Sequence, residues 1–212
     1  KMMRLLFTIL TLTPLWLYGQ VPIIQWQKTY GGSGDDRLVS IKKTADGGYI
    51  LGGHSTSGIS GEKTEATRGD YDYWIIKIDQ IGNIQWQKTY GGAHKDMLSS
   101  IIQTSDLGYF VTGYSESAAT GDKTDGNRGT IGSASVGRDF WLLKLDQTGN
   151  LVWQKTYGTT AADMGFVGIQ LPDGGYMTAG LTAGAGGERN TSANAAPVYG
   201  YNDHWMLRLD AH

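Results

Sequence analysis

The sequence contains no cysteine, which removes several kinds of chemistry at once. Disulfides, thiol nucleophiles and thiolate metal sites are all excluded. Proline is scarce, with 4 residues, whereas glycine is abundant, with 32. Charge of one sign is also lacking, because the net charge is only −2. This balance argues against nucleic acid or an anionic membrane as the dominant partner.

A long hydrophobic run occurs only at the beginning of the sequence. The basic residue Lys1 precedes the apolar run Leu5–Leu17, and the small residue Gly19 follows it. This order is typical of a signal peptide, which we place at residues 1–19. The run is interrupted by Pro14 and is shorter than the roughly 20 residues that a membrane helix needs. We therefore expect export, and no membrane span after signal removal.

The remainder, residues 20–212, contains an internal repeat. The segment Ile24–Gly32 recurs letter for letter at Ile84–Gly92, and its core returns at Trp153–Gly158. A second series has aspartate two positions before tryptophan, and a third series forms an Asp-Gly-Gly-Tyr or Asp-Leu-Gly-Tyr turn. We divide the repeats approximately into 31–90, 91–157 and 158–212, with 23–30 added to the last.

Each repeat is predicted to form four short strands, because apolar residues alternate with a period of two and turn residues separate the runs. The turn aspartates Asp46, Asp106 and Asp173 are interpreted as hairpin formers, since aspartate and glycine accept the backbone of a tight turn. No segment after the signal peptide has a helical period. The strands are expected near 37–44, 48–54, 71–79 and 84–90, and at the equivalent positions of the other copies.

The fold class is therefore all-β, and a β-propeller-like array of three four-stranded antiparallel blades is the architecture that such meanders form. We expect the N-terminal strand, residues 23–30, to complete the last blade, which would give twelve strands and hide an exposed edge. Three blades are fewer than the usual four to eight. Three explanations stay open: a homodimer that forms a six-bladed ring, a fragment of a longer repeat protein, or a tight three-bladed ring.

The pattern W-Q-K-T-Y-G-G, D-G-G-Y, D-x-W-[IL]-[IL]-K-[IL]-D and G-N resembles the propeller-type repeat of secreted and surface proteins of Bacteroidetes. Those proteins often carry a C-terminal sorting domain for type IX secretion. The resemblance covers essentially the whole of residues 20–212. It implies an exported repeat domain that is extracellular or on the outer cell surface.

Motifs for catalysis are not found. The sequence has no G-x-S-x-G, no Walker-type glycine loop, no G-x-G-x-x-G and no H-E-x-x-H. The histidines do not pair at the spacing of metal ligands. We therefore predict no catalytic residue, no metal site and no cofactor.

Candidate ligand-binding residues lie where the loops of a propeller would emerge. Asp36, Asp96 and Asp163 begin the inner strands, where they could either cap loop amides or form a ring of carboxylates. The loops Ser55–Asp70, Ser115–Arg138 and Thr182–Tyr201 are long and dissimilar, and loops on a rigid scaffold often carry binding. The complete set of candidates is Asp36, Asp96, Asp163, His54, His94, Asp122 and Asp125.

Two functions follow from this pattern. The first is a secreted or cell-surface binding or scaffold module whose ligand is a carbohydrate or a protein. The second is a hydrolase or lyase that acts on polysaccharide through carboxylates on the loop face. A close pair of acids beside an exposed aromatic residue in a groove would favour the enzyme.

Overall fold

The computed structural model describes residues 21–128, 137–184 and 202–211. The predicted signal peptide, residues 1–19, lies outside them. Every regular element in the described residues is a β-strand, which confirms the all-β prediction. None of these residues belongs to an apolar helix of membrane-spanning length. The strands are β1 (Asp36–Lys43), β2 (Tyr49–Ser55), β3 (Asp72–Ile78), β4 (Ile84–Tyr90), β5 (Asp96–Gln103), β6 (Tyr109–Ser115), β7 (Asp139–Leu145), β8 (Leu151–Tyr157), β9 (Asp163–Gln170), β10 (Tyr176–Thr182) and β11 (Asp203–Leu209).

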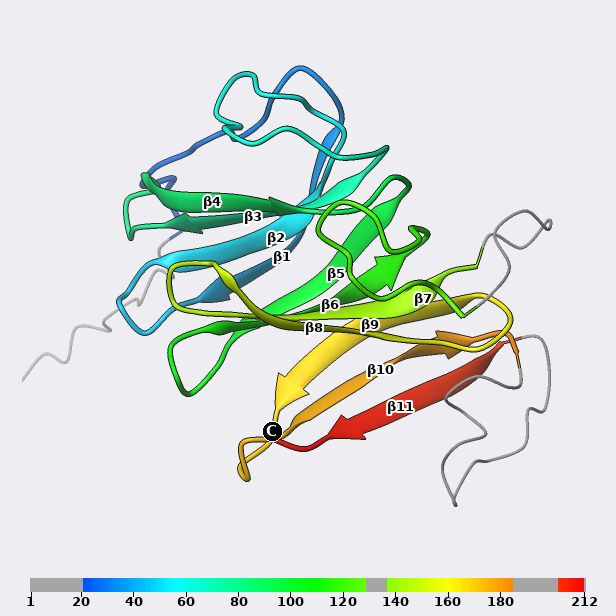
Figure 1. The fold of residues 1–212 in the computed structure, drawn as a ribbon. Helices are drawn as coiled ribbons and strands as arrows, with labels where there is room; N and C mark the ends of the chain where they lie inside the picture. Colours follow the sequence, from blue (N-terminus) through cyan, green and yellow to red (C-terminus); the bar gives the residue numbers. More distant parts are fainter. Residues whose placement is uncertain (1–20, 129–136, 185–201, 212) are drawn as a thin grey trace, which may run out of the picture.

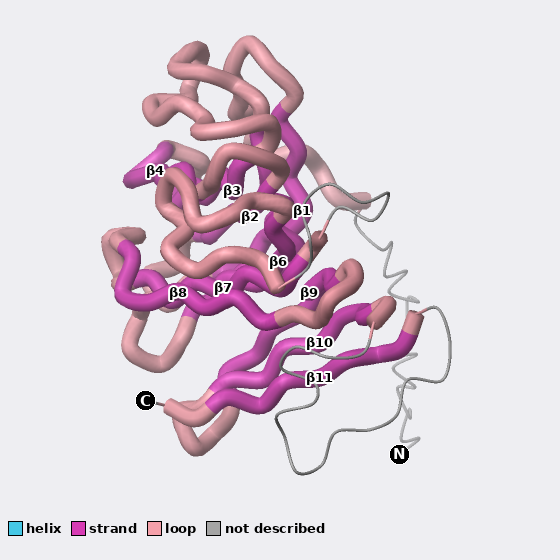
Figure 2. The backbone as a smooth tube through the Cα atoms, turned by 45° about the vertical axis from the view of Figure 1, so that its right-hand side comes forward, coloured by secondary structure: helices cyan, strands magenta, loops and turns pink. Residues whose placement is uncertain are grey.

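The strands form three antiparallel sheets, each made of consecutive strands. The first sheet has the order β1-β2-β3-β4, the second β5-β6-β7-β8 and the third β11-β10-β9. Figure 1 shows the second sheet between the other two, so the first and third sheets lie at opposite ends of the array. None of the three sheets closes on itself in the described part of the chain. Figure 2 shows the same succession from the side, with β9, β10 and β11 below the second sheet.

The third strand of a sheet is buried along its whole length when neighbours cover both of its faces. All seven residues of β3 and all seven of β7 are buried. In β3, Tyr73 and Ile75 belong to the core shared with the second sheet, whereas Trp74 and Ile76 belong to a separate core on the other face. Strands covered on both faces are mostly apolar, and here only the first residue and the lysine of each strand, Lys77 or Lys144, depart from that pattern.

The contact between the first and second sheets depends on residues of different size. Leu98 and Ile101 of β5 are fully buried against β2. Gly52 of β2 leaves the room that they need, because a Cβ atom at Gly52 would lie 2.8 Å from Ile101 and 2.9 Å from Leu98. Burying two such aliphatic side chains contributes about 3–6 kcal/mol before the entropy cost of ordering them.

The predicted hairpin turns form between the first two strands of each sheet. Asp46 Oδ1 accepts the N–H of Gly48 at 3.1 Å and the hydroxyl of Thr44 at 2.5 Å. Its other oxygen accepts a hydrogen bond from the buried Lys77 ammonium at 2.7 Å. Asp106 and Asp173 repeat the bond to the glycine N–H, with Lys144 and Arg208 as their cations. The turn-forming role of the three aspartates is confirmed.

Within a single chain, the N-terminal segment does not complete the last sheet as predicted. Residues 21–30 form no strand, and the third sheet has three strands, so the described chain holds eleven strands rather than twelve. The reason is a local anchor to the other end of the array. The hydroxyl of Tyr30 donates to the carbonyl of Gly82 at 2.7 Å, which ties this segment to the first sheet.

Leu107 generates a prediction about stability. It occupies the left-handed region, with φ of 65°, at the turn position where the other copies have Gly47 (φ 86°) and Gly174 (φ 87°). The left-handed conformation destabilises a leucine by roughly 1–2 kcal/mol. Glycine avoids this strain, but it also has a more flexible unfolded state, which offsets part of the gain in stability. We expect Leu107→Gly to raise the free energy of unfolding by about 0.5–1 kcal/mol, measured by urea denaturation.

The matched control is the reverse change in the first repeat. Gly47→Ala places a side chain at the same left-handed position, so it is expected to lower the free energy of unfolding by about 1 kcal/mol. If both changes moved stability in the same direction, the left-handed backbone would not be the cause.

Candidate functional site

The loop face is the end of the array where the connections 31–35, 91–95 and 158–162 lie beside the long loops that follow β2 and β6. An aspartate begins the inner strand of each sheet at this face. Asp36 Oδ2 accepts the N–H of Gly32 at 2.7 Å, and Asp96 Oδ2 accepts that of Gly92 at 2.7 Å. Asp163 Oδ2 accepts the N–H of Thr159 at 2.6 Å. The structure thus gives all three the capping role that the sequence left as one alternative.

The caps also hold the loop that leaves the second strand of the same sheet. The hydroxyl of Ser57 donates to Asp36 Oδ2 at 2.9 Å, and that of Ser117 donates to Asp96 Oδ2 at 3.0 Å. Asp36 and Asp96 therefore each join two loops that are more than twenty residues apart in sequence. Asp163 shares the first part of this role, since it accepts both the N–H and the hydroxyl of Thr159.

Neighbouring sheets bring a second series of buried acids close to the caps. The N–H of Asp96 donates to the carbonyl of Tyr71 at 2.6 Å, which places Asp72 beside Asp96. Burial raises the pKa of Asp72 to about 7, helped by the charge of Asp96. Burial likewise raises the pKa of Asp96 to about 6. Both side chains are fully shielded from solvent, so a substrate has no access to these protons.

The described parts of the loops after β2 and β6 are alike over residues 61–68 and 121–128, which corrects the expectation that these two loops are dissimilar there. Gly61 and Gly121 both have positive φ, at 55° and 59°. The N–H groups of the next residues, Glu62 and Asp122, donate to the carbonyls of Gly31 and Gly91. The shared signal is G-[ED]-K-T-[ED]-x-x-R, which begins at residues 61 and 121. Extra residues after Arg128 obscured the match.

A buried lysine holds each of these loops from inside. Lys63 donates to the carbonyl of Glu65 and to the hydroxyl of Thr89, the latter at 2.7 Å. Lys123 donates to the carbonyl of Asp125 and to Asn127 Oδ1 at 2.9 Å. Burial lowers the pKa of Lys123 to about 8. The sequence analysis missed both lysines, although their identical place in the loop motif could have shown them.

The candidate acids of the second loop are already engaged by arginines. Asp122 Oδ2 lies 2.7 Å from Arg68 Nε and accepts the N–H of Gly91 at 3.1 Å. Asp125 binds the Arg128 guanidinium through both carboxylate oxygens, at 3.0 and 3.1 Å, and these bonds lower its pKa. Both acids therefore stabilise the loops, and Asp122 links the loop of the second sheet to that of the first.

The two candidate histidines differ in exposure. The side chain of His94 is exposed, and its backbone N–H donates to the Ser117 hydroxyl at 3.0 Å. His54 is buried at the end of β2, and burial lowers its pKa. Its ring lies nearly perpendicular to the Tyr71 ring, with centroids 5.5 Å apart. His54 thus supports an aromatic residue at the loop face.

That aromatic residue belongs to an exposed polar cluster on the first sheet. The Tyr71 hydroxyl donates to Asp35 Oδ2 at 2.7 Å, and Arg37 Nε donates to the same oxygen at 2.8 Å. The Arg37 guanidinium lies 5.4 Å from the centroid of the Tyr71 ring. The hydrogen bond from Arg37 lowers the pKa of Asp35. We call Asp35, Arg37 and Tyr71 the first arginine–tyrosine cluster.

A second arginine–tyrosine cluster lies on the second sheet and consists of Tyr114, Glu116 and Arg138. The Arg138 guanidinium lies 5.6 Å from the centroid of the Tyr114 ring, and its Nε donates to Glu116 Oε1 at 2.9 Å. Arginine and tyrosine thus meet on both sheets, although they come from different repeat positions. These residues vary between repeats, whereas the capping aspartates beneath them do not.

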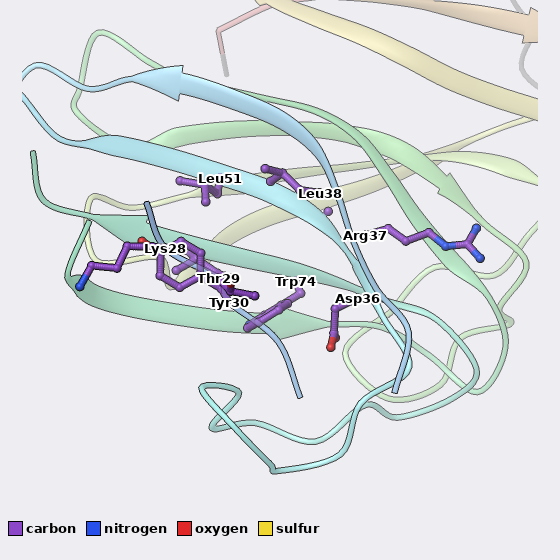
Figure 3. A pocket seen from close by; sticks show the side chains of 10 residues that line it. Lys28, Thr29, Tyr30, Asp36, Arg37, Leu38, Leu51 and Trp74 are labelled. Atoms are coloured by element: carbon purple, nitrogen blue, oxygen red, sulfur yellow. The ribbon is translucent and has the colours of Figure 1, made fainter. Parts of the chain in front are cut away.

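A cavity of about 250 Å³ lies on the outward face of the first sheet. Tyr30, Leu38 and Trp74 line it, and Arg37 extends away from the other labelled side chains (Figure 3). The walls are mostly apolar, and Asp36, which borders the cavity, is occupied by its capping bonds. The cavity offers apolar contact rather than acid–base chemistry.

Residues 21–128, 137–184 and 202–211 contain no group of three or more histidine, aspartate or glutamate side chains arranged to hold a metal ion. The fold and the site define an all-β repeat protein of stacked antiparallel sheets, in which hydrogen bonds to aspartate and lysine side chains hold the loop face. No protein-family model matches the chain, and no curated protein matches its sequence.

The buried acids generate a prediction about pH. The pKa values of Asp72 and Asp96 in the folded state exceed the ordinary value of about 3.9, so the folded chain binds more protons between about pH 4 and 7. The free energy of unfolding therefore falls as pH rises through this range. Asp72→Asn removes one titrating group and keeps an oxygen that can accept the Arg68 N–H. We expect its stability relative to the wild type to increase by on the order of 2 kcal/mol between about pH 4 and 8.

The control is Asp125→Asn, measured by urea denaturation over the same pH series. The pKa of Asp125 is lowered by Arg128, so its contribution to stability is present above the ordinary aspartate pKa and is lost only at lower pH. Its difference from the wild type should stay constant between about pH 5 and 8. Parallel stability curves for Asp72→Asn and the wild type would contradict the buried-acid argument.

Proposed function

We propose that the chain is a β-propeller-type scaffold module that binds a protein ligand through its loop face. The observation that carries this proposal is the contrast between repeated buried residues and varied exposed ones. The caps Asp36 and Asp96 and the buried lysines Lys63 and Lys123 hold the loops in the same way on two sheets. A rigid framework with variable tips limits the entropy that binding costs.

The chemistry of the exposed tips favours a protein over a carbohydrate. Arginine and tyrosine are enriched at the energetic centres of protein interfaces, and the loop face has both in each of its two clusters. Tyr71 and Tyr114 contact an arginine at the ring face, which leaves less free aromatic surface for a sugar ring. The two clusters are on adjacent sheets, linked where the Tyr71 carbonyl accepts the N–H of Asp96.

Hydrolysis of polysaccharide has less support. A glycosidase needs two carboxyl groups beside the scissile bond, one of them free to donate a proton. Asp122 and Asp125 bind arginines, and Asp36, Asp96 and Asp163 bind backbone amides. Burial raises the pKa of Asp72, Asp96 and Asp122, but the first two are fully buried and Asp122 is paired with Arg68. Because these carboxyl groups are already hydrogen-bonded or buried, a binding role is favoured over hydrolysis.

The propeller-type arrangement, export and surface location belong to the same proposal. The sheets follow one another as blades of a propeller do, with consecutive antiparallel strands and equivalent inner strands. Export is supported by the sequence of residues 1–19, and a surface location by the resemblance of the repeats to those of Bacteroidetes surface proteins.

The proposal predicts that the arginine–tyrosine clusters control binding. Peptides selected from a displayed random library against the purified chain serve as the probe, with an array of glycans tested in parallel. We expect Tyr71→Ala and Arg138→Ala to weaken the binding of selected peptides roughly tenfold or more. Lys43→Ala, an exposed change at the opposite end of β1, should have no effect.

The same samples distinguish the alternative. Incubation with polysaccharides, followed by measurement of newly formed sugar ends, tests for hydrolysis or elimination. Retention of glycans without selection of peptides, or release of sugar ends that Asp122→Asn abolishes, would contradict a protein-binding scaffold.

A further inference from the structure

The N-terminal segment lies against the first sheet as a fourth strand lies against the sheet that follows it. The Tyr30 hydroxyl donates to the carbonyl of Gly82 at 2.7 Å, and the Tyr90 hydroxyl donates to that of Gly149 at 2.6 Å. Trp26 borders Gly82 in the way that Trp86 borders Gly149. Segment 24–30 therefore occupies the place of a preceding sheet's last strand, although no strand pairs with it among the described residues.

The opposite end of the array has the complementary feature. In the first two sheets the third strand pairs with a fourth, and the tryptophan of the third strand donates to a glutamine of the fourth. Trp74 Nε1 donates to Gln87 at 2.9 Å, and Trp141 Nε1 donates to Gln154 at 3.0 Å. In the third sheet, β11 carries Trp205 at the equivalent position and has β10 as its only strand neighbour in the described chain.

The outward face of the first sheet exposes residues whose counterparts are buried. Leu38 is 57% exposed and Ile41 is 53% exposed. Their counterparts on the second sheet, Leu98 and Ile101, are 1% and 0% exposed because the first sheet covers them. The cavity of Figure 3 lies on this uncovered face, where Leu38 and Trp74 line it.

The outward face of the third sheet also exposes apolar counterparts of core residues. Met206 is 66% exposed, whereas its counterpart Leu142 is fully buried between the second and third sheets. Ile169 is exposed, and its counterpart Ile102 packs against that same core. Contiguous exposed apolar surface on a sheet marks a contact with another protein surface.

The side chains on the two outward faces are complementary in size. At the internal contact, the large residues Leu98 and Ile101 fit against Gly52. The outward face of the first sheet has large residues at those positions, and the outward face of the third sheet has the small Ala179 at the position of Gly52. Between the second and third sheets the small and large residues change sides. There the small Gly168 belongs to the third sheet, and it lies against Phe110 and Thr112 of the second.

We propose that two copies of this chain associate head to tail, so that the third sheet of each copy packs on the first sheet of the other. Segment 24–30 of each copy then becomes the fourth strand beside β11 of its neighbour. The result is a closed pair with six four-stranded sheets, within the usual range for propellers. This proposal rests on the propeller-type arrangement proposed above, but not on the ligand of the loop face.

The internal sheets define the register of the intermolecular pair. In the second sheet, Trp141 is opposite Thr156 and Leu142 is opposite Lys155. By the same register, Trp205 lies opposite Thr29 of the second copy, and Met206 lies opposite Lys28 of the second copy. Gln27 of the second copy is then in position to accept the hydrogen bond of the Trp205 indole.

The absence of cysteine permits a direct test by cross-linking of the full exported chain. Residues opposite each other in antiparallel strands have Cα atoms about 4.5–5.5 Å apart, within the span of a disulfide. The double variant Lys28→Cys, Met206→Cys should form a disulfide-linked dimer on mild oxidation. A mixture of the two single variants should form a singly linked dimer, and neither single variant alone should do so efficiently.

The control pairs Met206→Cys with Lys88→Cys. Lys88 is the counterpart of Lys28 in β4, which is already paired with β3, so this variant should not form the dimer. A disulfide within one chain would overturn the proposal, because it would mean that segment 24–30 pairs with its own β11. If the control formed the dimer equally well, cross-linking would reflect random collision, and the proposal would be overturned. A ladder of larger species would overturn the closed pair.

Introducing a charged residue into the proposed contact gives an independent test of dimerisation. We expect the wild-type chain to have the mass of a dimer by light scattering, and Ile41→Asp to weaken dimerisation by roughly 30-fold or more. Val152→Asp is the matched control, since Val152 is equally apolar and exposed but lies on the outer strand β8. Ile41 is exposed in the single chain, so circular dichroism should show both variants folded. A monomeric wild type at all micromolar concentrations would overturn the proposal, and peptide binding by that monomer would leave the loop-face function intact.

Discussion

The capping of a loop by an aspartate at the start of each inner strand is the interaction on which this structure depends; Asp96 and Asp163 are fully buried, and Asp36 is half-buried. Removing a carboxylate from water is costly unless it accepts several hydrogen bonds. Asp36 accepts them from Gly32 in the connection before β1, from Ser55 at the end of β2 and from Ser57 in the loop after β2. One side chain therefore fixes two loops at the same end of the sheet. The loop face can vary at its tips because its base is fixed in this way.

The sequence predicted the strands and turns because these depend on neighbouring residues. The alternation of Trp74, Ile76 and Ile78 and the turn at Asp46 are local patterns, and the observed strands differ from the predicted bounds by about one residue. The position of segment 24–30 could not be predicted in this way. Its letters match those of β4, so its local preference is that of a fourth strand, but pairing with a particular edge is a long-range choice.

The site was predicted in part for the same reason. The caps stood out because Asp36, Asp96 and Asp163 follow the repeated segment at equal distance. The loops were judged dissimilar because extra residues after Arg128 shift the sequence that follows. Lys63 is a charged residue in a polar loop, where the usual expectation is exposure. Its buried ammonium is hydrogen-bonded to Thr89, which lies on β4 and becomes a partner only in the folded sheet.

The repeats are similar in backbone but not interchangeable, because the contacts between them alternate in size. At the first contact, Gly52 receives Leu98 and Ile101, whereas at the second contact Gly168 of β9 receives Phe110 and Thr112. Exchanging the second and third sheets would place Gly168 against Gly52 and leave a gap between the first two sheets, which close-packed interiors do not tolerate. The order of the sheets is thus encoded in complementary side-chain volumes, since the backbone pattern alone would permit any order. The same volumes restrict what can cover the two outward faces: a surface that fits Leu38 and Ile41 must be small where they insert.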